Sequence, residues 1–380
     1  MPAMDDAVGD IAWEADGVQH RARFLSARGG SPPRRIVSAD DETTADAAFR
    51  LVSQGTALVW DGDYHNARQM LQALGRRVDR KRKPPVADEP AAIFNAYRLA
   101  QAQRANLLGL LLVPLRDGRV PLRRAPDVAL AVSEAIGPLA GEAVLPLRDL
   151  LAMVSAHEWR RNGVPIRALD GTTIHPHYGV FPPTRQDYVD LVAAAPLPVE
   201  VEVAFDLGTG SGVLAAVLLH RGVSRIVATD AAPRALASAA DAFDRLGVAD
   251  RVTLVPDRLY PDGRASLAVC NPPWLPAKAG TSLEAAVYDP DSAMLRGFLT
   301  GLGGHLLPGG EGWLIMSDLA EHLGLRAPGE LAAMIAGAGL RVLSRMDAAP
   351  SPKGVRDSAD PLHFARKREV VSLWRLGTSP

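Results

Sequence analysis

Apolar and polar positions along the C-terminal half of the chain follow a regular succession of strand and helix patterns. Short apolar runs typical of buried strands are separated by stretches in which apolar residues recur at helical spacing. Seven runs predict strands, at residues 201–205, 225–229, 251–255, 265–270, 313–316, 341–345 and 369–376. Buried strands that alternate with helices form parallel sheets covered on both faces. We therefore expect an α/β fold with a doubly wound, mostly parallel seven-stranded sheet.

The N-terminal half carries a mixed pattern. Asp16-Gly17 stands between two alternating segments, which predicts a β-hairpin, and short strand patterns follow at residues 36–37 and 57–60. Helical patterns cover residues 43–53, 64–74, 89–112, 127–136 and 147–159. The apolar run 107–115 reads as the buried end of the third of these helices. Together the patterns indicate a small α/β arrangement.

Length and composition fit a division into two domains. A chain of 380 residues exceeds what one core usually supports. We expect a smaller mixed α/β domain for substrate recognition over residues 1–162 and the domain with the large sheet over residues 163–380. A degenerate second copy of the C-terminal fold in the N-terminal half is the alternative. Hydrophobic residues make up 47% and charged residues 22%, which is ordinary for a soluble globular protein.

Charge, cysteine content and targeting signals bound the function classes. The net charge is −1, so the whole chain gives no case for nucleic acid, and any basic surface must be local. The single cysteine, Cys270, excludes an internal disulfide framework and a Cys-rich zinc site, and it fits a reducing compartment. The N-terminus is acidic and lacks an apolar run, and no run approaches the roughly 18 apolar residues of a membrane span. We expect a cytoplasmic protein without a membrane segment.

Two features of the sequence leave alternatives open. Residues 76–83 carry six cations and one anion, and they read either as a solvated linker or as a strip that contacts phosphates. His175 and His177 alternate on one predicted strand and could chelate a metal, but no third ligand lies nearby in the sequence. We therefore expect no metal site.

A glycine-rich turn follows the first strand of the predicted large sheet, in Asp206-Leu-Gly-Thr-Gly-Ser-Gly212. Gly208, Gly210 and Gly212 let the backbone approach a ligand without an intervening side chain. In a doubly wound sheet, this is where a nucleotide-like ligand binds. The spacing differs from the G-x-G-x-x-G pattern. Because the Asp206 carboxylate would repel a pyrophosphate and attract an ammonium group, the turn argues against a dinucleotide.

Two further acids stand at the ends of the next two predicted strands. Asp230 closes the second strand, and a carboxylate there can accept hydrogen bonds from both hydroxyls of a ribose. Asp257 follows the third strand and could accept from the exocyclic amine of an adenine. Either acid alone could be a turn or capping residue. Their shared position at strand ends, beside the glycine turn, favours ligand binding.

Asn271-Pro-Pro-Trp274 follows the fourth predicted strand and offers groups that could orient a planar nitrogen. The side-chain oxygen of Asn271 and the carbonyl of Pro272 could accept the two hydrogens of an amide or aromatic amine. Pro272 and Pro273 fix the direction of the backbone. Trp274 offers a flat face for stacking. Since Asn has no useful pKa, the motif indicates positioning and electrostatics rather than general-base catalysis.

These motifs give residues 170–377 a resemblance to the class I S-adenosylmethionine-dependent methyltransferases. The matching residues are Asp206, Gly208, Thr209, Gly210, Gly212, Asp230, Asp257 and Asn271 to Trp274. The resemblance implies a Rossmann-like fold and S-adenosylmethionine as the cofactor, bound by the glycine turn and the acids. Phe181 and Thr184 match loosely the family residues that precede the first strand and contact the cofactor. The family more often has Tyr or Phe where this chain has Trp274.

In that family, Asn-Pro-Pro followed by an aromatic residue marks methylation of planar nitrogens. Its substrates include glutamine amides in release factors or a ribosomal protein, and amino groups of adenine or guanine in nucleic acid. We therefore expect an N-methyltransferase that acts on RNA or on a translation protein. The alternatives are an N-methyltransferase of a small metabolite and a non-catalytic protein that kept the cofactor fold.

Overall fold

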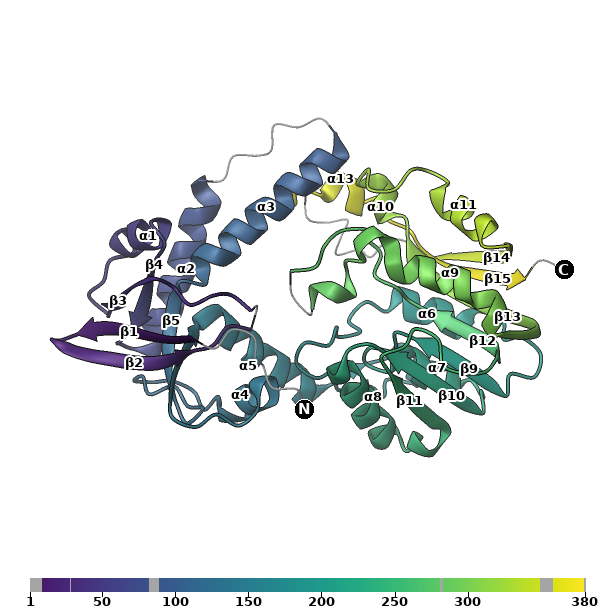
Figure 1. Cartoon of the computed structure of the whole chain (residues 1–380), viewed down its shortest axis with the longest axis horizontal. Helices are drawn as coiled ribbons and strands as arrows, with labels where there is room; N and C mark the ends of the chain where they lie inside the picture. Colours follow the sequence, from purple (N-terminus) through teal and green to yellow (C-terminus); the bar gives the residue numbers. More distant parts are fainter. Residues whose placement is uncertain (1–8, 28, 82–88, 281–282, 349–357, 379–380) are drawn as a thin grey trace. The chain divides into compact units, whose positions relative to one another are not determined.

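The computed structural model describes residues 9–27, 29–81, 89–280, 283–348 and 358–378. Contacts between residues divide the chain into two compact units (Figure 1). Unit 1 comprises the described parts of residues 1–86 and 95–158, and unit 2 those of residues 87–94 and 159–380. Each unit has its own sheet.

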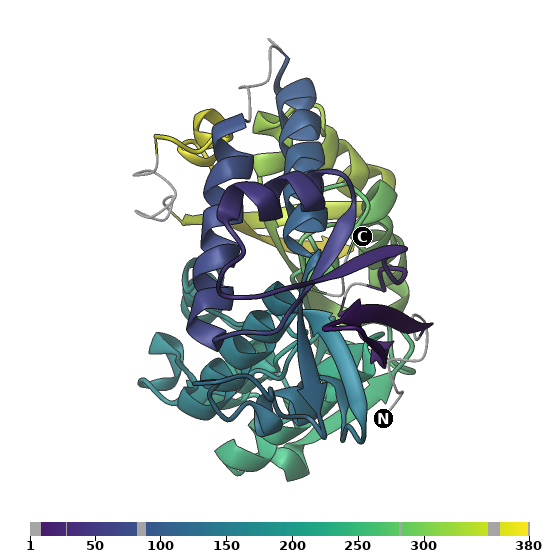
Figure 2. The same cartoon turned by 90° about the vertical axis from the view of Figure 1, so that its left-hand side faces the viewer.

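Unit 1 contains a six-stranded mixed sheet, whose β1–β2 hairpin is dark purple in Figure 2. Its strands are β1 (Gly9–Ala15), β2 (Val18–Phe24), β3 (Arg35–Ala39), β4 (Thr56–Trp60), β5 (Leu111–Arg116) and β6 (Glu142–Pro146), in the order β1-β2-β6-β5-β4-β3. Asp16 and Gly17, both with positive φ, make the tight turn between β1 and β2, so the predicted hairpin is confirmed.

The helices of this half are α1 (Ala45–Ser53), α2 (Tyr64–Lys81), α3 (Pro90–Leu108), α4 (Ala129–Ile136) and α5 (Leu147–Asn162). Helix α1 begins after Thr44, whose side chain accepts a hydrogen bond from the backbone N–H of Ala47. Helix α2 continues well beyond residue 74, and Nε of Arg77 donates to Asp46 across 2.8 Å. The linker reading of the basic run is therefore wrong for the part within α2, and its last two residues lie outside the described part of the chain.

Two elements of unit 1 differ from the sequence prediction. The run 107–115 is not the end of a helix, because α3 stops at Leu108 and β5 begins three residues later. Strand β6 was not predicted. It pairs antiparallel with β5 and parallel with β2, and so joins the hairpin to the rest of the sheet. The apolar residues of 107–115 are thus shared between a helix end and a mostly buried strand.

Unit 2 is built on a seven-stranded sheet, as predicted. Its strands are β9 (Val203–Leu207), β10 (Arg225–Asp230), β11 (Val252–Pro256), β12 (Ala265–Cys270), β13 (Leu306–Ser317), β14 (Leu340–Ala348) and β15 (Val371–Thr378), in the order β11-β10-β9-β12-β13-β15-β14. The first five in this order are parallel, and β15 runs antiparallel to both of its neighbours. The strand order reverses on either side of β9, which is where doubly wound sheets bind ligands.

Helices cover both faces of this sheet. They are α6 (Asp187–Ala194), α7 (Val213–His220), α8 (Pro233–Leu246), α9 (Ala293–His305), α10 (Leu319–His322), α11 (Glu330–Gly337) and α13 (His363–Arg366). Successive residues of β9 point to opposite faces, so Ala204 packs in a core with α6, α7 and α8, and Phe205 packs in a second core with α9 and α11. The two cores hold the carboxyl ends of the strands in place.

Short elements complete unit 2. They are the strand pair β7 (Val164–Pro165) and β8 (Thr173–Ile174) and the 3-10 turns η1 (Arg167–Leu169), η2 (Ala249–Arg251), η3 (Glu284–Ala286) and η4 (Pro290–Ser292). Cys270 is fully buried in the second core, as expected of a core residue. Among all helices of the described residues, none has the length and apolar character needed to cross a membrane.

Candidate functional site

Three sequence motifs meet at the carboxyl edge of the large sheet. In the strand register, Leu207 of β9 pairs with Thr229 of β10 on one side and with Cys270 of β12 on the other. The next residues along these three parallel strands are Gly208, Asp230 and Asn271. The glycine turn, the second acid and the Asn-Pro-Pro corner therefore lie side by side at one edge of the sheet.

The glycine turn is held against β10 by backbone hydrogen bonds. The N–H groups of Gly208 and Thr209 both donate to the carbonyl oxygen of Thr229, each across 2.9 Å. Gly208, Gly210 and Gly212 have φ values of 75°, 55° and 80°, which lie in the left-handed region that favours glycine. A Cβ on Gly210 would meet no atom closer than 4.0 Å, so this residue faces open space. A ligand could approach the backbone there.

Asp206 supports the turn from beneath. It is 1% exposed, and its Oδ2 accepts hydrogen bonds from the hydroxyl of Thr209 across 2.7 Å and from the backbone N–H of Ala215 across 3.1 Å. The second of these satisfies a free N–H in the first turn of α7. Burial raises the pKa of Asp206 to about 6, although these hydrogen bonds act in the opposite direction. The carboxylate thus has a loop-holding role that the sequence did not reveal.

Asp230 connects the glycine turn to the start of α8. Its Oδ2 accepts from the N–H of Gly210 across 3.0 Å, and its Oδ1 accepts from the N–H of Ala232 across 2.8 Å. Burial raises the pKa of Asp230, and the backbone donors partly offset that rise. Asp257 is exposed, with φ at +58°, and its N–H donates to the carbonyl of Asp230. Both acids therefore lie at the ends of neighbouring strands beside the turn.

The Asn-Pro-Pro corner is closed by its own aromatic residue. Nε1 of Trp274 donates a hydrogen bond to Oδ1 of Asn271 across 2.9 Å. Pro272 is buried, whereas Asn271, Pro273 and Trp274 are partly exposed. The side chain of Trp274 also packs against both cores of unit 2. Oδ1 of Asn271, the acceptor predicted from the sequence, therefore already accepts one hydrogen bond from within the motif.

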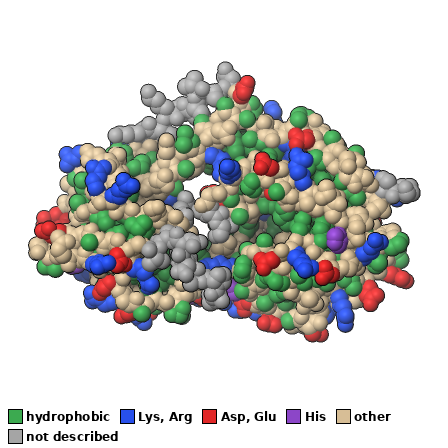
Figure 3. All heavy atoms as spheres, viewed as in Figure 1, with side chains coloured by type: hydrophobic (Ala, Val, Ile, Leu, Met, Phe, Trp, Pro, Cys, Tyr) green, Lys and Arg blue, Asp and Glu red, His purple; other side chains and the backbone are tan. Residues whose placement is uncertain are grey.

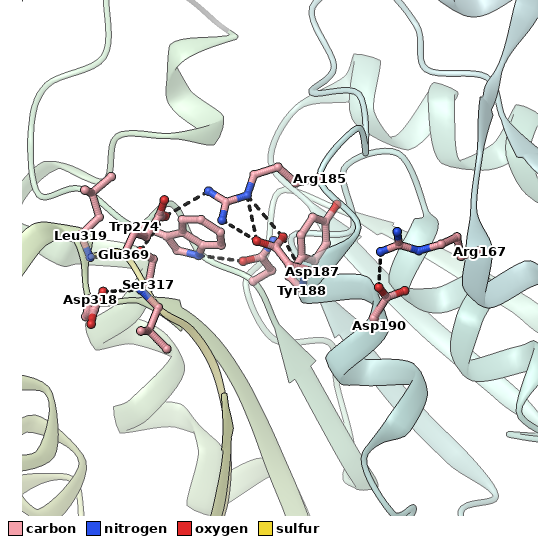
Figure 4. A network of polar contacts seen from close by, with 12 residues as sticks. Arg167, Arg185, Asp187, Tyr188, Asp190, Trp274, Ser317, Asp318, Leu319 and Glu369 are labelled. Atoms are coloured by element: carbon pink, nitrogen blue, oxygen red, sulfur yellow. Dashed lines mark hydrogen bonds and ion pairs between the residues drawn. The ribbon is translucent and has the colours of Figure 1, made fainter. Parts of the chain in front are cut away.

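A charged network surrounds Trp274 (Figure 4). The guanidinium of Arg185 lies 5.0 Å from the centre of the indole ring. Its Nη2 donates to Asp187 across 2.5 Å and its Nη1 to Glu369 across 3.0 Å. Burial lowers the pKa of Arg185, but the two carboxylates outweigh it and leave the pKa above its ordinary value. No motif in the sequence points to Asp187 or Glu369, and Glu369 lies 184 residues from Arg185 in the chain.

Phe181 and Thr184 precede α6 and are both exposed. Thr184 does not cap this helix. The helix begins after Gln186, and no side chain makes the capping hydrogen bond at that residue. Asp187 instead receives the N–H of Tyr188 across 3.0 Å. The region ahead of α6 is therefore ordered by Arg185 and Asp187 rather than by the threonine.

The two histidines that could have formed a metal pair have separate partners. His175 contacts the carbonyl oxygen of Arg160 through Nδ1 across 2.7 Å and the hydroxyl of Thr173 through Nε2 across 2.8 Å. His177 contacts the carboxylate of Asp241 across 3.2 Å. In the part of the chain that the structure describes, no group of three or more His, Cys, Asp or Glu side chains is placed to hold a metal ion.

Comparison with known proteins gives a consistent picture. The family model described as "Methyltransferase small domain" matches residues 171–322, which include the glycine turn and the Asn-Pro-Pro corner. A release factor glutamine methyltransferase from Cereibacter sphaeroides is 30% identical over 239 residues, which cover 56% of this chain and 83% of that protein. One from Moorella thermoacetica is 39% identical over 140 residues, which are 34% of this chain and 49% of that relative. The chain thus spans about half the length of the second relative.

A solved structure is also similar to this chain. It is that of a ribosomal protein L11 methylase from Lactobacillus delbrueckii subsp. bulgaricus, with 18% sequence identity and a TM-score of 0.38. The similarity covers 56% of this chain and 88% of that one.

Proposed function

Because this chain belongs to the S-adenosylmethionine-dependent methyltransferase family that includes the release factor glutamine methyltransferases, we propose that it methylates a glutamine side-chain amide in a protein of the translation apparatus. The observation that carries the proposal is the position of Asn271 at the end of β12, in register with the glycine turn at the end of β9. S-Adenosylmethionine is the cofactor, and it supplies a methyl group activated by a positively charged sulfur.

The edge of the sheet fits this cofactor. Gly210 faces open space, so the backbone can lie directly against a ligand. Each oxygen of Asp230 accepts one backbone N–H and keeps a lone pair for a ribose hydroxyl. Asp257 is exposed at the next strand end, where it can accept from the adenine amine. Asp206 contributes negative charge beneath the turn, which favours a cofactor that carries an ammonium group. Phe181 and Thr184 are proposed to flank the cofactor from the segment ahead of α6.

The corner after β12 is proposed to orient the methyl acceptor. A primary amide is a poor nucleophile, because its nitrogen lone pair is delocalised into the carbonyl group. Oδ1 of Asn271 and the carbonyl oxygen of Pro272 accept the two amide hydrogens, with Pro273 fixing the backbone. This turns the nitrogen toward the methyl group and makes its lone pair more available. On transfer, the nitrogen would gain the methyl carbon while the bond between that carbon and the cofactor sulfur would break, with its electron pair kept by the sulfur. The nitrogen would then lose one proton to water.

Two observations favour a protein over a nucleic acid as substrate. Relatives that match stretches of 239 and 140 residues carry the name release factor glutamine methyltransferase. Among the described residues on the face drawn in Figure 3, Lys and Arg side chains are interspersed with Asp and Glu over each unit, which does not produce the single-sign field that attracts nucleic acid. Unit 1 is proposed to bind the substrate protein. With a substrate of this class, the reaction is proposed to take place in the cytoplasm.

The test incubates the protein and methyl-labelled cofactor with an extract of cells that lack this protein. Samples are then treated with nuclease or with protease. We expect label that is lost only to protease, and mass spectrometry of the labelled peptide should place the methyl group on a glutamine amide. Label lost to nuclease would instead indicate a nucleobase. Label found in neither fraction would indicate a small metabolite, and either of these results overturns the proposal.

Asn271→Ala provides the companion measurement. This variant should bind the cofactor with wild-type affinity in calorimetry, since the amide is assigned to the methyl acceptor and not to the cofactor. It should transfer no methyl group to the labelled protein. Methyl transfer at the wild-type rate would remove the role proposed for the Asn271 amide.

A further inference from the structure

On the basis of the function proposed above, we propose that Arg185 and Trp274 are positioning residues that hold the Asn271 side-chain amide in the orientation needed for methyl transfer. Arg185 lies over the indole ring of Trp274, and the indole donates a hydrogen bond to Asn271. All three residues belong to unit 2. The arrangement uses the indole N–H, a group that Tyr or Phe at this position does not provide.

The indole decides which way the amide of Asn271 points. An Asn side chain has an oxygen and an NH₂ group of nearly equal size, so it can take two orientations related by a flip. The indole N–H can only donate, and the atom that faces it across 2.9 Å must therefore be the oxygen. A carbonyl oxygen has two acceptor sites. One is occupied by Trp274, and the other stays available for a hydrogen of the methyl acceptor.

Arg185 in turn fixes the indole. Its guanidinium is tied on one side to Asp187 at the start of α6 and on the other to Glu369 just before β15. Glu369 is 8% exposed and also accepts the hydroxyl of Ser317 across 2.8 Å. With two carboxylates beside it, Arg185 stays cationic and presents a planar charged group to the ring, which is the geometry of a cation–π contact. Two distant segments of the chain thereby hold one side chain of the corner.

This arrangement bears on the class of methyl acceptor. Trp274 has Arg185 over its ring and packs against both cores of unit 2. The indole therefore serves as a hydrogen-bond donor through its N–H rather than as a stacking surface for a nucleobase. The acceptor sites left at the corner are the second site of the Asn271 oxygen and the carbonyl of Pro272. Two acceptors match the two hydrogens of a primary amide, and this deepens the proposed specificity for glutamine.

Two conservative variants separate the roles of these residues. Trp274→Phe keeps a ring and removes the N–H donor. Arg185→Lys keeps the charge and removes the planar fork that binds two carboxylates. We expect each variant to lower kcat by about 10- to 100-fold, because a misplaced reacting group costs rate rather than binding. We expect KM for cofactor and protein substrate to change by less than about threefold.

Arg345→Lys is the matched control. Arg345 lies 4.7 Å from the centre of the Trp374 ring in the same unit and is hydrogen-bonded to Asp347. This variant makes the same chemical change over another tryptophan, at strands β14 and β15. We expect it to retain wild-type kcat. A loss of kcat equal to that of Arg185→Lys would mean that any such Arg–Trp contact matters only for the stability of unit 2.

Nuclear magnetic resonance of the indole N–H groups tests the contacts without any substrate. The chain has six tryptophans, and Trp274→Phe identifies the signal of Trp274 by removing it. We expect that signal to shift in Asn271→Ala and in Arg185→Lys, and to stay in place in Arg345→Lys. An unmoved signal, or a shifted signal with wild-type kcat, overturns the proposal. Should wild-type protein label no protein substrate, the proposed function fails, and the spectra still decide whether Arg185 and Trp274 hold the amide.

Discussion

Gly210 donates a backbone hydrogen bond to Oδ2 of Asp230 across 3.0 Å, which joins the tip of the glycine turn to the end of β10. The other oxygen of Asp230 is held by the N–H of Ala232 across 2.8 Å. The carboxylate is therefore fixed in orientation by two backbone donors from different segments. The oxygens of Asp230 are therefore already oriented before a ligand reaches their remaining lone pairs. Little conformational entropy is then lost on binding.

Replacement of Asp230 should therefore weaken cofactor binding more than it weakens the fold. Asp230→Ala removes both ribose acceptors, and two lost hydrogen bonds correspond to an increase of about 100-fold in Kd for S-adenosylmethionine. Calorimetry measures the affinity, and the thermal midpoint checks the fold. Asp244→Ala, at an exposed position on helix α8, which follows Asp230 in the chain, is the control and should bind normally. An unchanged Kd in Asp230→Ala would remove the ribose role.

The glycines at the two ends of the turn predict different losses of stability. A Cβ on Gly212 would lie 2.9 Å from the Phe243 ring and 3.3 Å from Cα of Ala239, in the backbone of α8. A Cβ on Gly208 would lie 2.4 Å from Cε of Met294, the mobile end of a flexible side chain. Both residues have φ near +80°, a conformation that costs alanine about 1–2 kcal/mol. We expect Gly212→Ala to lower the free energy of unfolding in urea more than Gly208→Ala.

Replacement of Gly210, unlike that of Gly208 or Gly212, should affect cofactor binding more than the stability of the fold. Its Cβ position is open, so Gly210→Ala should cost only the backbone strain of about 1 kcal/mol in the free energy of unfolding. The same methyl group would occupy the surface that faces the cofactor, and Kd should rise steeply. Urea unfolding and calorimetry on this variant measure the two effects separately. A variant that is strongly destabilised but binds the cofactor normally would contradict this assignment of the open face.

The arrangement of the site at the sheet edge could be predicted from the sequence because parallel strands end at a common edge. Gly208, Asp230 and Asn271 each follow an apolar run directly, and the register of β9, β10 and β12 brings them together. To predict that these three residues lie together, only the order of the strands and helices and the identity of the residue after each strand were needed. The seven-stranded sheet and its two covered faces followed from the same pattern.

Contacts between segments far apart in the chain could not be predicted in this way. Arg185 and Glu369 meet because β15 is inserted between β13 and β14, and that insertion leaves no periodic signal. The hydrogen bond from Trp274 to Asn271 joins residues that are close in the sequence. It still could not be predicted, because a hydrogen bond between two side chains depends on rotamers that the sequence does not specify.

The two errors in unit 1 have separate physical sources. The apolar run 107–115 contains Gly109, and the helix stops at Leu108, one residue before it. Glycine is common just past a helix end, so this residue was the signal for a break. Strand β6 is short and ends in Pro146, and such a strand is hard to distinguish from a loop when its partners are unknown.

Unit 1 contains a buried carboxylate paired with two exposed arginines, and this pairing should make its stability sensitive to acid. Asp63 is fully buried, and its carboxylate accepts from Arg124 across 2.5 Å, from Arg123 across 3.1 Å and from the backbone N–H of His65. The hydrogen bond from Arg124 is the main cause that holds the pKa of Asp63 at about 2. A lowered pKa stabilises the folded state above the ordinary value near 4, and that stability is lost as the pH falls toward 2.

Asp63→Asn should lower the unfolding midpoint of unit 1 at pH 7, because Arg124 loses its charged partner. The variant should also show a smaller further loss between pH 4 and pH 3 than the wild type. Urea unfolding at these pH values measures both effects. Asp61→Asn, at a nearby exposed position, should behave like the wild type throughout. Equal acid sensitivity of Asp63→Asn and wild type would show that the pair does not control it.

Asp206 should make cofactor affinity depend on pH in the opposite sense from its own contribution to the stability of the fold. Its pKa in the folded protein is raised to about 6, chiefly by burial. The folded state therefore holds the proton more tightly than the unfolded state does, and the contribution of Asp206 to stability declines as the pH rises from about 4 to about 6. Binding of a positively charged cofactor works the other way, because it favours the ionised carboxylate.

We therefore expect the affinity for S-adenosylmethionine to fall as the pH decreases from 7 to 5, by up to about tenfold for a group with a pKa near 6. In Asp206→Asn, the side-chain oxygen can still accept from Thr209 and Ala215, but the group cannot ionise. This variant should bind the cofactor more weakly at pH 7 and show little change between pH 7 and pH 5. Calorimetry across this range measures both proteins. A wild-type affinity that is flat, or a variant that keeps the wild-type slope, would show that another group senses the pH.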